Sequence, residues 1–260
     1  MSEPGQAGDV LVYSGPPKTM KKAIFFAALA LTAACNPPKY ATYESVNKDF
    51  TVSVPWGWQV ITDQQDNDFA QTVFIGPFDP DFYLGAPSLS VRWYRRYRAH
   101  RLPDGRLEMY GGVDDFIAQN LAQVYEPEYA LMPLDPKTWG NPLYYKKGGK
   151  AEGKYVVPDF TLKGSNLTGK GFVVESPTAA PEGNRWGISE SNVDHKGYVL
   201  RKHAYVVVPL EDGFYVLTYP ATERGIENHL DKFGALVGSF MPRTGGPGGA
   251  KVRLRAPASK

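Results

Sequence analysis

The sequence predicts an α+β domain, in which an antiparallel β-sheet has helices packed on its faces in an α/β/α sandwich. Three observations point to this fold class. Most apolar stretches alternate with polar residues, as strands do, whereas two stretches repeat with the period of a helix. Tyrosine, glycine and proline are plentiful, which suits strands joined by many turns. Two long apolar runs flank a short polar turn, which is typical of an antiparallel hairpin.

The first strands are expected in DFTVSVPWGWQVIT (49–62), QTVFIGP (71–77) and SLSVRWYRRYR (88–98). In the first stretch, Phe50, Val52 and Val54 alternate with polar neighbours, which indicates a half-buried strand. The third stretch alternates in the same way. Its pattern places Leu89, Val91, Trp93, Arg95 and Tyr97 on one face.

Two stretches follow the helical period. Residues 111–127 bring five apolar residues to one face, and Pro127 ends that helix. Residues 222–242 carry an apolar stripe of Ile226, Leu230, Phe233, Leu236, Val237 and Phe240. These segments provide the helices of the predicted sandwich.

The second half of the sheet is expected in GFVVES (171–176) and in a hairpin over 197–220 around Glu211-Asp212-Gly213. Residues 128–170 form the least regular part of the chain. They are predicted to contain long loops with one or two short strands, as an insertion in the domain.

An internal segment has the layout of a secretory signal. Lys21 and Lys22 precede a short apolar run, and small residues stand before Cys35, the single cysteine. The run is too short to span a bilayer, which needs roughly 20 residues. LTAAC (31–35) resembles the lipobox of bacterial lipoproteins, which implies lipidation of Cys35 with fatty acids such as palmitate. A buried free cysteine is the alternative.

The chain is therefore expected to divide into five parts. Residues 1–19 are interpreted as a spurious extension upstream of Met20, because they are rich in glycine, proline and serine and show no periodicity. The other parts are a lipoprotein signal peptide (20–34), a lipidated tether (35–42), the folded domain (43–242) and a disordered basic tail (243–260).

Composition narrows the function classes. Residues 1–34 hold three of the 29 basic and two of the 27 acidic residues, so the part from Cys35 onward is near neutral. It therefore lacks the strongly positive net charge that is typical of nucleic-acid-binding proteins. Once Cys35 is lipidated, no thiol remains for disulfides, iron–sulfur clusters or cysteine zinc sites.

Several stretches together resemble the PsbP/Mog-type family. FTVSVPWGWQV near the start, YVVVPLEDGFYVLTYPA and the closing FGALVGSF carry the likeness. Its positions are Phe50, Val52, Pro55, Gly57, Trp58, Tyr219, Phe233, Ser239 and Phe240. The resemblance implies an antiparallel sheet with helices on its faces and a role in binding or assembly, and it implies no shared catalytic site.

The conspicuous surface pattern is VRWYRRYRAHR (91–101). Alternation places Arg92, Tyr94, Arg96 and Arg98 on one outer face, with Trp93 and Tyr97 turned inward. These four residues are the predicted binding surface for a lipid headgroup, an anionic glycan or an acidic protein. The charged outer face of an ordinary strand is the alternative.

No catalytic or metal-binding motif emerges. GSNLTGKG (164–171) lacks the hydroxyl and the following helix of a phosphate loop. The four histidines show no zinc-ligand spacing, and the aspartates of 63–68 and 79–81 lack the EF-hand pattern. No cofactor is expected, and no catalytic or metal residue is assigned. Paired carboxylates for glycoside cleavage stay an open alternative, because such pairing is spatial and not readable from the sequence.

The favoured function is that of a cell-envelope lipoprotein with a non-catalytic binding or scaffolding role. Its partners would be the membrane, through Cys35, and an envelope protein, glycan or lipid headgroup, but not nucleic acid. Asn36 after the cysteine favours the outer over the inner membrane, by resemblance to enterobacterial sorting. Two alternatives stay open: a periplasmic hydrolase or small-ligand-binding protein with a site near 128–170, and a cytosolic protein with an unmodified Cys35.

Overall fold

The computed structural model describes residues 37–82, 85–101, 105, 107–179 and 198–252. The predicted extension (1–19), the signal peptide (20–34), Cys35 and the end of the tail lie outside the described residues. The part from Lys39 onward clusters as a single unit. In the described part of the chain, no helix has the length and apolar character needed to cross a bilayer.

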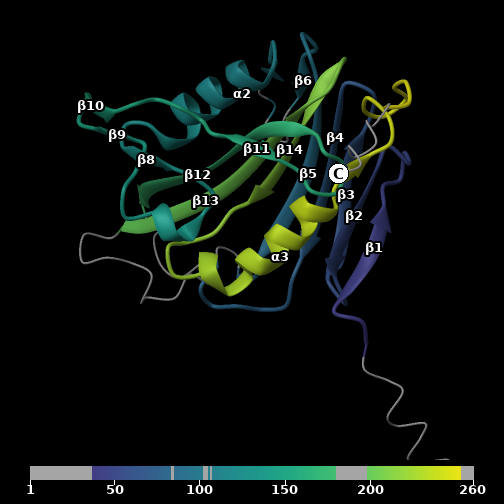
Figure 1. The fold of residues 1–260 in the computed structure, drawn as a ribbon, viewed down its shortest axis with the longest axis horizontal. Helices are drawn as coiled ribbons and strands as arrows, with labels where there is room; N and C mark the ends of the chain where they lie inside the picture. The colour runs from purple at the N-terminus through teal and green to yellow at the C-terminus, as the bar shows by residue number, and fades with distance from the viewer. Residues whose placement is uncertain (1–36, 83–84, 102–104, 106, 180–197, 253–260) are drawn as a thin grey trace, which may run out of the picture. The chain divides into compact units, whose positions relative to one another are not determined.

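A ten-stranded antiparallel sheet forms the centre of the fold (Figure 1). Its strands follow the order β10-β9-β8-β12-β13-β14-β5-β4-β3, with β11 paired to β12. Their bounds are β3 (Gln59–Gln65), β4 (Phe69–Ile75), β5 (Ser88–Arg95), β8 (Tyr129–Met132), β9 (Tyr144–Lys147), β10 (Lys150–Gly153), β11 (Asp159–Thr161), β12 (Thr168–Ala179), β13 (Tyr198–Pro209) and β14 (Gly213–Tyr219). The predicted antiparallel sheet is confirmed.

Two smaller sheets complete the strand set. A three-stranded sheet pairs β1 (Tyr40–Glu44), β2 (Phe50–Pro55) and β15 (Met241–Pro242) in that order. A two-stranded ribbon pairs β6 (His100–Arg101) with β7 (Leu107–Glu108). The helical segments are α2 (Val113–Asn120), the π-helical turn η2 (Leu121–Tyr125), the 3-10 turn η3 (Pro136–Thr138) and α3 (Ile226–Ser239). The described chain is thus rich in sheet, and helices are a small part of it.

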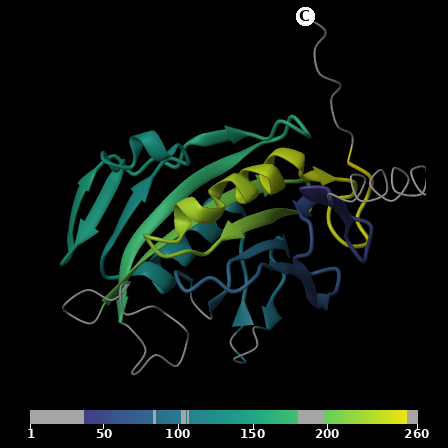
Figure 2. The ribbon, with the colours of Figure 1, turned by 90° about the horizontal axis from the view of Figure 1, so that it is seen from below.

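The core lies on both sides of the central strands. On one side, Phe233, Leu236 and Val237 of α3 share a cluster with alternate residues of β5 and β14, such as Trp93 and Tyr215. Figure 2 shows α3 along the long strands. On the other side, Phe116 and Ile117 of α2 pack in a second cluster with the intervening residues, Tyr94, Phe214 and Val216. Every residue of β14 is therefore buried.

The predicted hairpin over 197–220 is confirmed, because β13 and β14 pair from Pro209↔Phe214 to Ala204↔Tyr219. The predicted helix before Pro127 is also present, as α2 continued by η2. Residues 128–170 are more regular than expected. They contain β8, β9, β10 and β11, all joined to the main sheet.

The prediction of a disordered tail from residue 243 is wrong for residues 243–252. The backbone N–H groups of Arg243 and Thr244 both donate to the carbonyl oxygen of Asp49, at 2.7 and 3.2 Å. Thr244 pairs with Lys251 as an antiparallel bridge, which closes a glycine-rich loop. We call residues 244–251 the glycine loop. The high glycine content, which suggested disorder, instead permits its close turns.

Candidate functional site: a furrow at the end of the sheet

The predicted binding surface is not assembled as the sequence suggested. Arg92 and Tyr94 both turn to the side of β5 that α2 covers. Tyr94 is only 3% exposed and packs against Phe69, Phe116 and Phe214. The prediction of an exposed Tyr94 is therefore wrong, because a second apolar layer buries the face that alternation marked as outer.

Arg96 and Arg98 lie beyond the end of β5 and point to different surroundings. The Arg96 Nη2 donates to the backbone oxygen of Leu210 at 2.8 Å, which ties β5 to the β13–β14 turn. Tyr97 adopts a positive φ of 56° and is 72% exposed, whereas the sequence predicted that it turns inward. This left-handed residue breaks the alternation of the strand. Of the four predicted residues, Arg98 alone is exposed.

Beneath η2 lies a buried polar network that the sequence did not predict. The hydroxyl of Tyr125 is 2.5 Å from the hydroxyl of Tyr205 and 2.7 Å from Nδ1 of His203. Burial, with the nearby Arg201 cation, lowers the pKa of His203 to about 3, so this imidazole is neutral. Arg201 lies over the Tyr125 ring and donates to the Ser176 hydroxyl. Tyr125 and Tyr205 are sealed from solvent, so the network holds η2 on the sheet rather than receiving a solute.

Asp66 and Asp79, two of the aspartates considered as calcium ligands, are engaged in hydrogen bonds within the protein. Asp66 Oδ1 accepts from the backbone N–H groups of Asp68 and Phe69, at 2.9 and 2.7 Å. Asp79 Oδ1 accepts from the N–H of Asp81, and its Oδ2 lies 3.1 Å from Nε2 of His229. Within the described residues, no group of three or more histidine, cysteine or acidic side chains is arranged to hold a metal ion.

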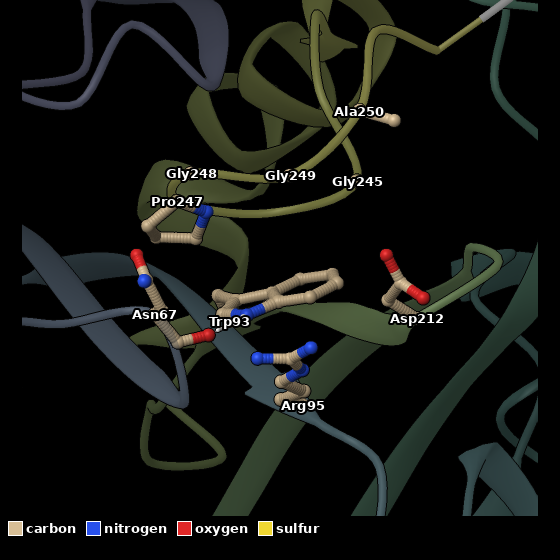
Figure 3. A pocket seen from close by; sticks show the side chains of 9 residues that line it. All are labelled: Asn67, Trp93, Arg95, Asp212, Gly245, Pro247, Gly248, Gly249 and Ala250. Carbon is tan, nitrogen blue, oxygen red and sulfur yellow. Dashed lines mark hydrogen bonds between the residues drawn. The ribbon is translucent and has the colours of Figure 1, made fainter.

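Three neighbouring cavities form a furrow at one end of the sheet. The middle cavity, of about 160 Å³, lies between β5, the β13–β14 turn and the glycine loop (Figure 3). It shares Asn67 with the second cavity, which is bordered by Asp66, Asp68 and Arg101. It shares Asp212, Gly245 and Ala250 with the third, wider one, which reaches Lys251. If the protein were a hydrolase or a small-ligand-binding protein, its site was expected near residues 128–170. No residue of that range lines these three cavities.

Trp93 forms the floor of the furrow. Its Nε1 donates to the backbone oxygen of Asn67 at 3.1 Å, and its ring packs on Tyr215 with 4.9 Å between centroids. Figure 3 shows the glycine loop on one side of the indole and Arg95 on the other. The loop reaches this position because position 246 has no side chain. A Cβ there would lie 2.1 Å from Trp93 Cε2, and its φ of 98° also favours glycine.

The furrow presents charges of both signs. Arg95 and Asp68 lie 3.5 Å apart at half-exposed positions, which makes their ion pair weak. Glu211 and Asp212 add negative charge on the β13–β14 turn, and Lys251 and Arg101 add positive charge at the two ends. Together with the backbone groups of the glycine loop, the furrow can form ion pairs and hydrogen bonds with a partner that carries both charges.

The sequence did not reveal the furrow. Asn67, Asp212 and Gly245 come from three distant parts of the chain, and only the antiparallel sheet brings them together. One signal was present in the sequence: the stretch MPRTGGPGGAKVRL (241–254) has polar and apolar residues on both sides of a glycine-rich turn, as a hairpin has.

Comparisons with known proteins find distant likenesses to solved structures, among them the following two. No family model matches the chain, and no curated protein matches it. The chain is similar to the cyanobacterial PsbP (CyanoP) of Synechocystis sp. PCC 6803, with 10% identity, 80% of this chain and 95% of the other covered, and a TM-score of 0.38. It is also similar to PA94 of Pseudomonas aeruginosa, a protein of unknown function described as a putative regulator. The identity there is 12%, the coverage 79% and 99%, and the TM-score 0.36. Likenesses this distant carry no argument about function.

Proposed function

We propose that this chain is a lipid-anchored protein of the bacterial cell envelope, whose PsbP/Mog-like domain binds a partner protein without catalysing a reaction. The observation that carries the proposal is the furrow. It combines a glycine loop, packed on the buried Trp93, with charges of both signs. A protein surface that carries both charges and backbone groups is complementary to such a lining.

Contacts between the early and late family-like stretches support the fold part of the proposal. The rings of Phe50 and Phe240 pack with centroids 5.8 Å apart. The backbone N–H of Ser53 donates to the Ser239 hydroxyl at 2.7 Å. The two stretches that resemble the family therefore meet in one core. The positions of α2 and α3 in separate core clusters are in keeping with helices on both faces of the sheet.

The short distance between Cys35 and the domain supports the anchor part. β1 begins at Tyr40, so the link between a lipidated cysteine and the first strand spans only about 15–20 Å when extended. A domain on so short a tether stays beside the membrane. We propose attachment at the outer membrane, through acyl chains on Cys35, on the basis of the lipobox and Asn36.

Intact mass from native membranes tests the anchor. A chain that begins at an acylated Cys35 supports the proposal, whereas a chain that retains Met1 and a free thiol contradicts it. This measurement is independent of the furrow.

Site-specific photocrosslinking in intact cells tests the furrow. A photoreactive amino acid is placed at the exposed Glu211 and, as a control, at the exposed Lys163, which lies in a loop before β12. We expect a discrete crosslinked partner from position 211 but not from position 163. Arg95→Glu should abolish that product while leaving the protein folded. A product that is the same from both positions, or that survives Arg95→Glu, would refute the furrow as the binding site.

A further inference from the structure

The two edges of the ten-stranded sheet differ in their protection. One edge is β10, which has four residues, carries Lys150 and Glu152, and ends in Gly153. Short edge strands with charged side chains do not readily pair with another strand. This edge is therefore unfavourable for pairing with a strand of another chain.

The other edge, β3, lacks these features along most of its length. It has seven residues, and Val60 and Ile61 are 42% and 48% exposed on its two faces. Between Gln59 and Thr62 the strand has no acidic or basic side chain, and Asp63 is its single acidic residue. An exposed edge with β-branched side chains is a template for a further strand.

We infer that β3 pairs with β3 of a second copy of this chain, antiparallel, with Ile61 at the two-fold axis. In this register Ile61 faces the partner's Ile61, and Val60 faces the partner's Thr62. Asp63 faces the amide of the partner's Gln59. The resulting dimer joins the two large sheets into one.

Charge and apolar complementarity select this register and this partner. A two-fold axis at Thr62 would set Ile61 opposite Asp63, which pairs an apolar side chain with a charge. A two-fold axis at Asp63 would oppose two carboxylates. With Ile61 at the axis, apolar residues meet in the middle, and each carboxylate meets a neutral hydrogen-bond donor.

The bulge in β3 sets the extent of the contact. The register with β4 shifts between Asp63 and Gln65, which ends the regular edge. About five residues per copy then remain for pairing. A contact of this length buries less surface area than the roughly 1,200 Å² of a stable protein–protein interface. The dimer is accordingly weak in dilute solution. If the chain is anchored as proposed above, confinement to a membrane raises the effective concentration and favours the dimer.

Cysteine crosslinking of the full chain in its membranes tests the dimer. We compare Ile61→Cys with Val156→Cys, a control at an exposed β-branched residue in the loop between β10 and β11. The parent chain, with Cys35 alone, sets the background. Mild oxidation should give a disulfide-linked dimer from Ile61→Cys at least several-fold above both controls. A mixture of Gln59→Cys and Asp63→Cys chains should also crosslink, because the register sets these positions opposite each other.

A second variant tests the same surface without oxidation. Ile61→Lys should shift the full chain in detergent from a concentration-dependent dimer to a monomer in sedimentation, whereas Val156→Lys should not. The inference is overturned if Ile61→Cys gives no more dimer than Val156→Cys, or if Ile61→Lys leaves the sedimentation unchanged. Failure here would leave the intact mass and the furrow crosslink unaffected.

Discussion

The hydroxyl of Tyr215 donates a hydrogen bond of 2.6 Å to Oδ2 of Asp49 in the buried core. Tyr215 belongs to the central strand β14, and Asp49 stands just before β2. The backbone oxygen of the same Asp49 accepts the N–H groups of Arg243 and Thr244. One residue therefore connects the middle of the large sheet with the base of the glycine loop.

Removal of the Tyr215 hydroxyl should destabilise both the centre of the large sheet and the attachment of the glycine loop. Tyr215→Phe leaves a buried carboxylate oxygen without its donor, which we expect to cost about 1–3 kcal/mol of unfolding free energy. Denaturant titration measures this loss. Tyr155→Phe at a half-exposed tyrosine is the control and should change the free energy by less than about 0.5 kcal/mol. Equal effects of the two substitutions would contradict the role assigned to Asp49.

Acid should destabilise the domain through His203. Its pKa is about 3 in the folded protein, because of burial and then Arg201, and near 6.5 in the unfolded chain. Between these values the unfolded state binds a proton that the folded state does not. The stabilising contribution of the neutral His203 is therefore fully present above about pH 6.5. Below that pH, the free energy of unfolding falls by about 1.4 kcal/mol per pH unit. Burial also lowers the pKa of His229, which adds a change of the same sign.

Urea titrations from pH 7.5 to 4 measure this slope. His203→Gln removes the titrating group but retains an acceptor for Tyr125, so it should flatten the dependence. A slope that the substitution does not change would show that other groups cause the acid effect.

Gly246→Ala should displace the glycine loop from Trp93. The added methyl group would overlap the indole, and φ at this position is 98°. We expect a loss of about 1–3 kcal/mol and a red shift of tryptophan fluorescence as Trp93 becomes hydrated. Gly234→Ala is the control, because this helical position has open space and alanine should stabilise it by up to about 1 kcal/mol. An unshifted emission in Gly246→Ala would argue against the packing of the loop on the indole.

Ser239→Ala should loosen the junction between β2 and the end of α3. The Ser239 hydroxyl accepts from the N–H of Ser53 and donates to the carbonyl of Ala235 at 2.7 Å. Its loss leaves the N–H of Ser53 without a partner, which we expect to cost about 1–2 kcal/mol. Hydrogen exchange at Ser53 should rise well above that of its neighbours in β2. Ser239→Thr retains the hydroxyl and serves as the comparison.

The sequence predicted the parts of the fold that depend on local pattern. The β13–β14 hairpin and the stripe of α3 follow from runs of β-branched residues and from helical spacing, so both were found. Burial of β5 on both faces was not predictable, because it depends on the packing of α2 against the strand and not on the sequence of the strand itself. The same limit applies to Tyr94, which local alternation marked as exposed although tertiary packing buries it.

The candidate site was less predictable than the fold. Arg96 is half-buried and Arg98 is exposed, and a single left-handed residue between them, Tyr97, sends them to different environments. The furrow needs three chain segments and a glycine loop whose composition resembles that of a disordered tail. Its formation depends on the exact fit of Gly246 against Trp93, which no local pattern encodes.

The π-helical turn η2 sets the rotational phase of the segment that ends at Tyr125. A regular α-helix advances about 100° per residue, and a π turn accommodates one additional residue. Because the wider turn absorbs that residue, the aromatic ring at its end keeps the phase of a regular helix and reaches His203 and Tyr205. The length of this segment can therefore change by one residue, from a π turn to an α turn, without rotating the ring away from its two partners.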